Sequence, residues 1–259
     1  MQDVPIVVIN LATATDRRRR MADQLHGLGL NHSVYRARTA DELPAFPGVS
    51  LRPQSMAYWS GKTLNSGMIG CFLSHYDLLA EMVRADMPHR LILEDDAVID
   101  PDLPEVLTNL AHLRFDWDLI KLAEIRPVGG LAYGSLDARR SLLRLTQPTF
   151  GTQGYLVSLA GAAKLLKRLR RLDGEVDGVI DRMGNAGVRI FTVRPNPIGH
   201  DLSQASTIRE QVAGAPKATG WDRWKRKALK MKRRLDRAAN RPRLYIDRVI
   251  DRPGRKDTP

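Results

Sequence analysis

The feature that most constrains the fold is a short apolar run that ends in three consecutive acids. Leu91-Ile92-Leu93 is followed directly by Glu94-Asp95-Asp96. Three aliphatic residues in a row are typical of a strand that is buried on both faces of a parallel sheet. Ligands of such sheets bind beyond the carboxyl ends of the strands, which is where the acids fall. The run therefore predicts an α/β fold with a ligand site at the acids.

These three carboxylates repel one another unless a positive group lies against them. Mn²⁺ or Mg²⁺ is the expected partner, because both prefer oxygen ligands. Side chains alternate along a strand, which would place Glu94 and Asp96 on one face and Asp95 on the other. The alternative role is a helix cap, but Asp100-Pro101-Asp102 already supplies one. Phosphatases, receiver domains and sugar transferases carry comparable acidic strand ends, so the motif alone leaves the class open.

Apolar runs of strand length alternate with amphipathic segments along the chain. We expect strands at 5–11, 31–37, 117–122, 142–145, 155–158 and 188–193, and helices at 16–28, 67–84, 103–113, 158–172 and from 176. This order predicts the α/β class with a mostly parallel central sheet, in one catalytic domain over residues 1–210. Residues 127–134 are expected to form a turn, and residues 195–208 a loop that contains His200. Irregular residues 38–67 form either a substrate lid or a packed surface loop.

The net charge of +12 is concentrated at one end of the chain. Residues 215–259 hold 16 Lys/Arg against 5 Asp/Glu, a net of +11, so the remaining residues are close to neutral. We assign residues 211–259 to a linker and a basic tail that docks on a polyanion. An apolar stripe at helical spacing with basic flanks predicts an interfacial helix on an anionic membrane, with contacts from Trp221, Trp224, Lys225, Arg226 and Lys227. The alternative is that the stripe packs on the catalytic domain.

Two further features bear on the compartment. Cys71 is the only cysteine, which excludes an intrachain disulfide and fits a reducing environment. The first residues show no signal-peptide pattern, and no apolar run approaches the ~20 residues of a membrane span. Together with the tail, these features predict a cytoplasmic protein that is peripheral on the inner face of the membrane.

Several short motifs occur in a family-specific order. They are Ile9-Asn10-Leu11 with Arg17-Arg18, Gly70-Cys71-Phe72-Leu73-Ser74-His75-Tyr76, Leu93-Glu94-Asp95-Asp96, Trp117-Asp118-Leu119-Ile120-Lys121-Leu122, Gly151-Thr152-Gln153-Gly154-Tyr155 and Val176-Asp177. In this order the chain resembles glycosyltransferase family 25, the lipooligosaccharide galactosyltransferases of bacteria and their collagen-modifying relatives. The resemblance covers residues 4–210 and leaves out the basic tail.

The resemblance implies a GT-A-like fold and a metal-dependent transfer that inverts the anomeric centre. The expected donor is a UDP-sugar, with galactose as the usual sugar, and the expected acceptor is a lipid-linked saccharide such as lipooligosaccharide, or another oligosaccharide. The acids at 94–96 look like the family's version of the DxD motif. The implied donor-binding residues are Asn10, Leu11, Arg17, Arg18, Ser74, His75, Glu94 and Asp95.

The resemblance also suggests the metal ligands and the general base. Asp96 is the expected metal ligand, with Glu94 or Asp95 assisting. His200 is either a further metal ligand or a surface histidine, and family members commonly carry a glutamine near its position. Asp177 is the leading candidate for the base that takes a proton from the acceptor hydroxyl, with Asp181 and Glu124 as alternatives. A helix N-cap is the other role open to the aspartate at 177.

Two other functions remain in competition with sugar transfer. A nucleic-acid-binding protein could use the basic tail, but the nearly neutral main domain has no recognised binding motif, so no specific nucleic-acid partner is expected. A metal-dependent phosphohydrolase could use the acids at 94–96. It would need a pattern such as Asp-x-Asp-x-Thr, whereas Ala97-Val98 follows the acids here.

Overall fold

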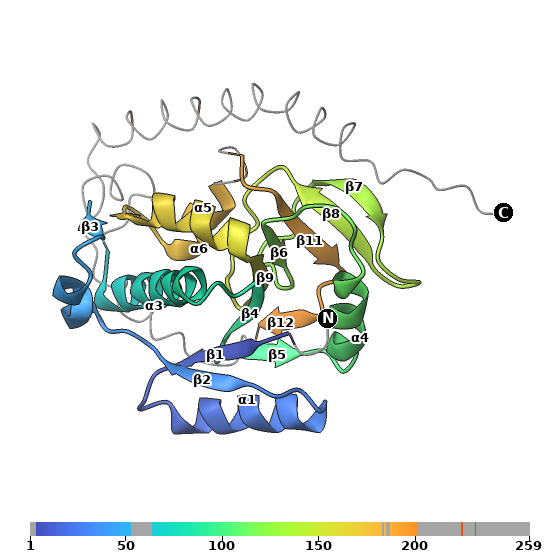
Figure 1. Ribbon diagram of the computed structural model, residues 1–259, viewed down its shortest axis with the longest axis horizontal. Coiled ribbons are helices and arrows are strands. Elements are labelled where there is room, and N and C mark those ends of the chain that lie inside the picture. Colours follow the sequence, from blue (N-terminus) through green and yellow to red (C-terminus); the bar gives the residue numbers. More distant parts are fainter. Residues whose placement is uncertain are drawn as a thin grey trace.

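The chain forms a mixed α/β fold around an eight-stranded sheet (Figure 1). The computed structural model describes residues 4–52, 64–182, 184, 187–200, 224 and 231. The strands of the main sheet lie in the order β2-β1-β4-β9-β6-β11-β8-β7. Their bounds are β1 Ile6–Asn10, β2 Ser33–Arg36, β4 His89–Glu94, β6 Leu119–Lys121, β7 Gly130–Ser135, β8 Ser141–Leu145, β9 Gly154–Ser158 and β11 Ile190–Arg194.

Helices and short strands complete the described part of the chain. The helices are α1 Thr15–Gly27, α3 Ser66–Arg84, α4 Leu103–Ala111, α5 Leu159–Leu169 and α6 Val176–Arg182, with a 3-10 helix, η1, at Ala40–Ala45. Two small ladders pair β3 Ser50–Leu51 with β10 Arg171–Leu172, and β5 Ala97–Ile99 with β12 Ile198–His200. No helix in the described ranges is long and apolar enough to cross a membrane.

The expectation of a mostly parallel sheet is wrong. β1 pairs in parallel with β2 and β4, and β6 with β11, but β9 is antiparallel to both of its neighbours, as β8 is to β11 and β7. The reason is the connection between β6 and β9. It consists of the β7–β8 hairpin and contains no helix that would return the chain to the starting end of β6. The chain therefore re-enters the sheet centre from the opposite end. Residues 130–134, expected in a turn, belong to this hairpin.

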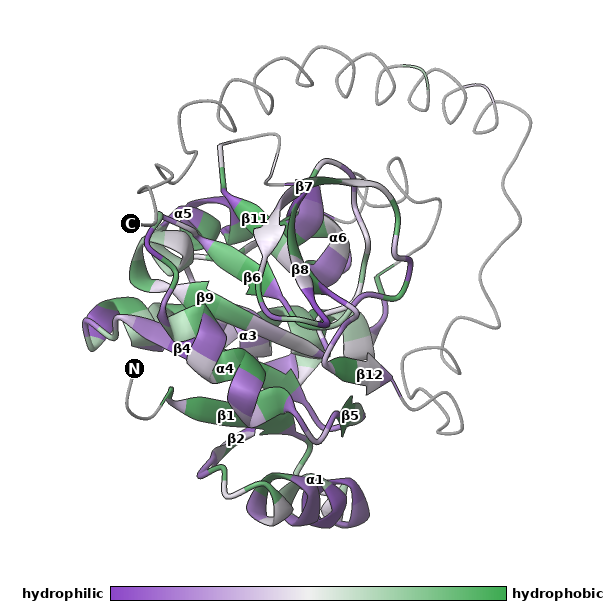
Figure 2. Cartoon of the chain, turned by 90° about the vertical axis from the view of Figure 1, so that its right-hand side faces the viewer, coloured by the Kyte–Doolittle hydropathy of each residue, from purple (hydrophilic) through white to green (hydrophobic). Residues whose placement is uncertain are grey.

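Helices cover both faces of the sheet, and alternate residues of each strand explain why. In β1, Val7 and Ile9 belong to the core under α3, α5 and α6, whereas Ile6 and Val8 belong to the core under α1 and α4. Figure 2 shows the apolar strands enclosed between helices whose outer faces are hydrophilic. Burial of both faces is what the aliphatic run before Glu94 predicts, and this part of the expectation is confirmed.

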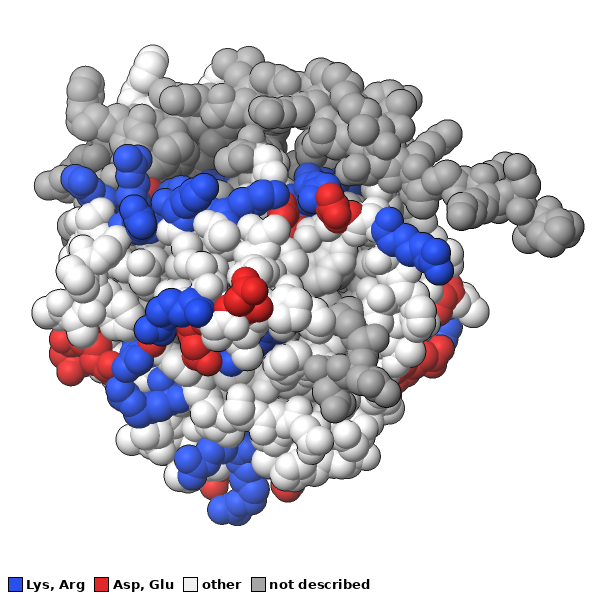
Figure 3. Space-filling model, in the orientation of Figure 1, with Lys and Arg blue, Asp and Glu red and all other residues white. Residues whose placement is uncertain are grey.

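The predicted amphipathic helix after residue 158 is α5. Ser158 caps it by accepting a hydrogen bond from the Gly161 amide, and its apolar side is buried while Lys167 and Arg168 lie in its last turn. A row of Lys and Arg side chains crosses the molecular face at the level of α5 and α6 (Figure 3). The basic tail itself lies outside the described residues. Of its five predicted membrane contacts only Trp224 is described, and it is 75% exposed.

Candidate active site at the carboxyl end of the central strands

The side chains of Glu94, Asp95 and Asp96, at the carboxyl end of β4, point toward three different neighbours. Asp95 lies on the β1 and α1 side, where Nδ2 of Asn10 donates to its Oδ2 at 2.6 Å. The guanidinium of Arg17 forms an ion pair with Asp95 Oδ1 at 3.0 Å. Burial nevertheless raises the pKa of Asp95, and Arg17 and Asn10 offset only part of that effect. These contacts connect the first strand and the first helix to the acidic strand end.

Glu94 points the other way, toward α3 and the loop before β9. His75 Nε2 lies 3.3 Å from Glu94 Oε1, and the hydroxyl of Thr152 donates to the same oxygen. The Tyr155 hydroxyl lies 2.8 Å from His75 Nδ1. Burial on its own would raise the pKa of Glu94, but the contacts with His75 and Thr152 outweigh it and lower the pKa. Glu94 is thus held as an anion by neighbours from two other elements.

Asp96 lies against the last strand that the structure describes. β12 pairs antiparallel with β5, with His200 opposite Ala97, and this pairing sets His200 Nδ1 3.4 Å from Asp96 Oδ2. The prediction that His200 lies in a loop is therefore wrong, because the residue closes a two-stranded ladder. Burial, Glu94 and Asp95 raise the pKa of Asp96 to about 7. The crowded acid has too little positive charge around it to stay fully ionised at neutral pH.

A divalent cation fits this end of the sheet. Oδ1 of Asp96, Nδ1 of His200 and Oδ1 of Asn10 are buried and have no hydrogen-bond partner among the described residues. Buried polar atoms are costly when unpaired, so these three atoms are suited to a partner from outside the chain. Carboxylate oxygens with one imidazole form a donor set that accepts Mn²⁺ or Mg²⁺.

Some of the predicted donor-binding residues lie away from this cluster. Ser74 is fully buried, donates to the Gly70 carbonyl and accepts from the Arg38 amide, so its hydroxyl joins α3 to the residues after β2. Arg18 is exposed on α1, and Leu11 packs against the core. Asn10, Arg17, His75, Glu94 and Asp95, in contrast, are brought together.

Asp177 begins α6 and faces the loop before β9. The Gly151 amide donates to its Oδ2 at 3.0 Å, and the Gly178 amide donates to Oδ1. Burial raises the pKa of Asp177, and nearby Asp181 and Glu175 add to the effect. No cation pairs with Asp177 among the described residues. Such a carboxylate has the raised basicity that a general base needs near neutral pH.

Cys71, in the second turn of α3, interacts electrostatically both with Asp177 and with the acids at the end of β4. Burial raises the pKa of its thiol well above the ordinary value, and the fields of Glu94, Asp177, Asp96 and Glu175 raise it further. A single thiol therefore lies within the fields of acids from two separate elements. The acids after β4 and those at the start of α6 thus contribute to the same electrostatic environment around Cys71.

Asp181 is engaged inside the fold. Lys121 Nζ lies 2.9 Å from Oδ1 and 3.1 Å from Oδ2, and the amides of Thr149 and Phe150 donate to Oδ2. The side chains of Asp181 and Lys121 are only 1% and 2% exposed. The structure therefore places this candidate base in a closed ion pair.

Glu124 is engaged in a similar way. The guanidinium of Arg194 contacts both of its oxygens, at 2.7 and 2.9 Å, and Asn196 donates at 3.3 Å. Burial would raise the pKa of Glu124, but Arg194 outweighs it and lowers the pKa. Of the three candidate bases, Asp181 and Glu124 each have a cationic partner, whereas Asp177 has none among the described residues and its pKa is raised.

Three residues near the acids were not predicted from the sequence as site residues. Thr152 and Tyr155 contact Glu94 and His75, and Cys71 lies one helical turn before His75. The Cys-x-x-x-His spacing was a usable signal, because residues four apart share a helix face. No local signal marked Thr152, since its role depends on the position of β9 beside β4.

The fold and the site define an α/β protein with a cluster of acids at the end of the central strand β4. The sequence model described as glycosyltransferase family 25 (LPS biosynthesis protein) matches residues 3–180. The chain belongs to this family, and the resemblance inferred from its motifs is confirmed.

Curated relatives carry both active and inactive names. Procollagen galactosyltransferase 1 of Danio rerio is 30% identical over 171 residues, covering 62% of this chain and 28% of the relative. Inactive glycosyltransferase 25 family member 3 of Homo sapiens is 32% identical over 179 residues, covering 64% and 29%. The chain thus spans less than a third of the length of these relatives. Membership of the family alone does not establish catalysis.

Similarity to solved structures is weaker. A glycosyltransferase involved in the glycosylation of the major capsid of PBCV-1 aligns with a TM-score of 0.46 and 9% identity, over 88% of this chain and 98% of the other. Mouse xyloside xylosyltransferase 1 aligns with a TM-score of 0.32.

Proposed function

We propose that the chain is a metal-dependent glycosyltransferase that moves a sugar, galactose in the first instance, from a UDP-sugar to a glycan acceptor with inversion. The observation that carries the proposal is the buried, unpaired oxygen of Asp96 opposite His200, at the end of β4. Family membership and relatives named as galactosyltransferases support the class of reaction. Because other relatives are named inactive, the proposal depends on this chain's own acids.

Asp96, His200 and Glu94 would hold Mn²⁺ or Mg²⁺. The ion would neutralise the charge that develops on the nucleoside diphosphate as it leaves. Glu94 reaches this role already ionised and oriented, since His75 and Thr152 hold one of its oxygens. A held carboxylate loses little conformational freedom on binding a ligand.

Asn10 and Arg17 would contact the donor. Both hold Asp95, and Asn10 also donates to the Ala14 carbonyl, so its free Oδ1 has a fixed direction. Arg17 stands on the first turn of α1, where a guanidinium and the helix N-terminus together favour an anionic group such as a diphosphate. These residues would fix the donor relative to the acids of β4.

Asp177 would accept the proton from the acceptor hydroxyl. The Gly151 amide fixes one of its oxygens, and its raised pKa makes the carboxylate a stronger base than an exposed aspartate. An inverting transfer requires one displacement, with the base on the acceptor side of the sugar. The acceptor is an oligosaccharide or a lipid-linked glycan in this proposal.

The test of this proposal is Asp96→Asn, assayed for transfer and for hydrolysis of UDP-galactose with Mn²⁺. Transfer should fall about a thousandfold, because a neutral amide cannot replace the carboxylate at a charged site. The melting temperature should not fall, since one of three crowded acids is removed. Glu105→Gln, an exposed acid on α4, is the matched control and should retain full activity. Near-normal transfer by Asp96→Asn would overturn the assignment.

The location of the protein is part of the same proposal. A peripheral position on the inner face of the membrane would bring the site to a lipid-linked acceptor, with the basic tail as the anchor. Co-sedimentation of the full chain with anionic vesicles should be strong at low salt and weaken with salt. Trp221→Ala combined with Trp224→Ala should reduce it further. Equal binding by the double variant and the wild type would contradict the role of the tail.

A further inference from the structure

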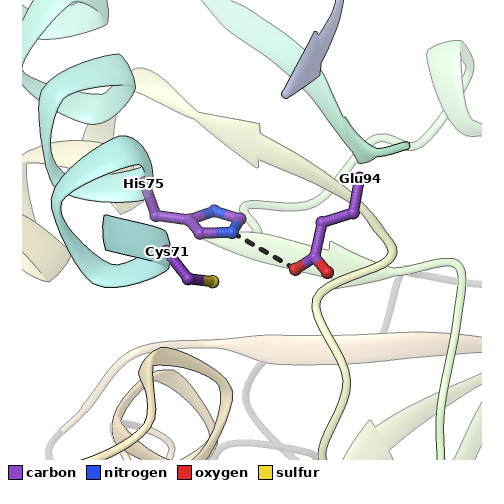
Figure 4. A group of neighbouring side chains, drawn as sticks. All are labelled: Cys71, His75 and Glu94. Atoms are coloured by element: carbon purple, nitrogen blue, oxygen red, sulfur yellow. Dashed lines mark hydrogen bonds and ion pairs between the residues drawn. The ribbon is translucent and has the colours of Figure 1, made fainter. Parts of the chain in front are cut away.

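Three potential metal ligands of different chemistry converge beside the acidic cluster. Cys71 and His75 stand four residues apart on α3, which places them on one face of the helix, and Glu94 reaches them from the end of β4 (Figure 4). One ligand atom from each residue lies within 4.8 Å of the other two. Cys71 is a free cysteine on a partly exposed residue of α3.

We infer that Cys71, His75 and Glu94 form a binding site for Zn²⁺, separate in chemistry from the Asp96 and His200 pair. One thiolate, one imidazole and one carboxylate are the ligand types that Zn²⁺ selects, whereas Mg²⁺ and Mn²⁺ prefer oxygen. Three protein ligands leave the fourth tetrahedral position for water or another small molecule. The inference concerns binding and does not rest on the transfer reaction.

The distances are compatible with such a site after a small movement. Zn–S and Zn–N bonds of about 2.3 and 2.0 Å place neighbouring ligand atoms about 3.3–3.7 Å apart in a tetrahedron. His75 Nε2 and Glu94 Oε1 are already 3.3 Å apart. The Cys71 sulfur would need to approach by roughly 1 Å, within the reach of a rotation about its Cα–Cβ bond. No hydrogen bond of the described residues holds the thiol back.

The neighbours of the ligands support the assignment. A zinc-bound histidine normally donates its other N–H to an oxygen, which fixes the tautomer. The Tyr155 hydroxyl lies 2.8 Å from His75 Nδ1 and can act as donor or acceptor, so it accommodates the tautomer that leaves Nε2 free for the metal. Thr152 donates to the carboxylate of Glu94 in the same way. Both of these ligands therefore have an oriented partner behind them.

Charge balance also favours a cation here. Cys71 lies in the fields of four carboxylates, those of Glu94, Asp96, Asp177 and Glu175. A divalent ion bound to the sulfur would let the thiol lose its proton. Zn²⁺ binding should therefore release the thiol proton. Because Glu94 serves both donor sets, Zn²⁺ bound here should draw it away from Asp96 and lower transfer.

The test uses Co²⁺ as an optical substitute for Zn²⁺ in the full-length protein. A thiolate-to-cobalt charge-transfer band in the near ultraviolet can come only from Cys71, because the chain has no other cysteine. The band should appear on titration with Co²⁺, disappear when Zn²⁺ is added, and be absent in Cys71→Ser. Zn²⁺ affinity should fall at least tenfold in Cys71→Ser and in His75→Gln, and calorimetry in two buffers should report release of the thiol proton.

Two controls separate this inference from its alternatives. His26→Ala combined with His32→Ala removes a neighbouring pair of imidazoles on the other side of the sheet and should leave the band unchanged. Asp96→Asn should also keep the band even where transfer is lost, so the failure of one idea does not imply the failure of the other. Binding of Co²⁺ without the sulfur band, or equal Zn²⁺ affinity in folded Cys71→Ser and wild type, would overturn the inference.

Discussion

Two kinds of buried acid occur in this molecule, and their surroundings are opposite in character. Glu124 and Asp181 are closed off by Arg194 and Lys121, with 0% and 1% of their side chains exposed. Asp96, which follows β4, is 20% exposed and lies 3.4 Å from His200 Nδ1, and Arg17 offsets only part of the repulsion from Glu94 and Asp95. The pKa of Glu124 is lowered, whereas that of Asp96 is raised to about 7.

We interpret this difference as one between acids that stabilise the fold and acids that serve the proposed cation site. A buried carboxylate with a cation and several amide donors is satisfied within the chain, and removing its charge leaves the cation unpaired. Carboxylates that lie close together repel one another, and a cation bound between them would reduce that repulsion. The comparison predicts that the first set controls stability and the second controls chemistry.

The largest effect on the first set is expected from Asp181→Asn. The variant keeps the shape of the side chain but leaves the ammonium of Lys121 buried without a counter-ion, so the free energy of unfolding should fall by about 3–5 kcal/mol. Chemical denaturation monitored by circular dichroism gives this value. Activity per folded molecule should change little.

A second substitution sharpens this prediction. Lys121→Met in the Asp181→Asn background removes the unpaired charge, so the double variant should recover part of the lost stability. If Asp181→Asn unfolds at the wild-type denaturant concentration but loses turnover, Asp181 belongs with the catalytic acids. That result would contradict its assignment to the acids that control stability.

The next largest effect is expected from Asp177→Asn. Loss of the base should lower kcat about a hundredfold to a thousandfold and leave the affinity for the donor nearly unchanged. In the wild type, burial raises the pKa of Asp177, so kcat/KM should fall with acid at a pH above the ordinary range of an aspartate, because the protonated carboxyl cannot accept a proton. A loss of stability with unchanged turnover per folded molecule would instead assign Asp177 to capping α6.

The smallest effect is expected from Glu124→Gln. Weakening its hydrogen bonds to Arg194 should cost about 1.5–3 kcal/mol near neutral pH. Since the folded-state pKa of Glu124 lies below its unfolded value, its contribution is present above the unfolded pKa and is lost as the pH falls through the folded pKa. The stability difference between variant and wild type should therefore shrink in acid. A difference that stays constant with pH would remove Glu124 from the set of paired acids.

The sequence was informative where one short segment determines the outcome. The aliphatic run before Glu94 indicated a strand buried on both faces, and the predicted helices over 16–28, 67–84 and 103–113 correspond to α1, α3 and α4. Helical periodicity and caps act within a few residues, so a single sequence can reveal them. The acidic strand end was located for the same reason.

Pairings between distant residues could not be predicted from the sequence. Lys121 and Asp181 are 60 residues apart, and Glu124 and Arg194 are 70 apart, so nothing local showed that these two acids already had cations. The direction of β9 was likewise hidden, because β7 at Gly130–Ser135 lacks the clear alternation of apolar residues that marks a strand, although the strand at 142–145 was predicted. Only the assembled sheet places Thr152 beside Glu94.

The position of β9 has a consequence for the order of folding. It is the strand that joins β2-β1-β4 to β6-β11-β8-β7 through backbone hydrogen bonds, since it lies between β4 and β6 in the sheet. During synthesis the first half-sheet therefore has an open edge at β4 until residue 158 has been made. Long-range pairing of this kind slows folding and exposes strand edges. In pulsed hydrogen exchange during refolding, the amides of β4 and β6 should gain protection together, and earlier protection of β4 would show that the two halves fold separately.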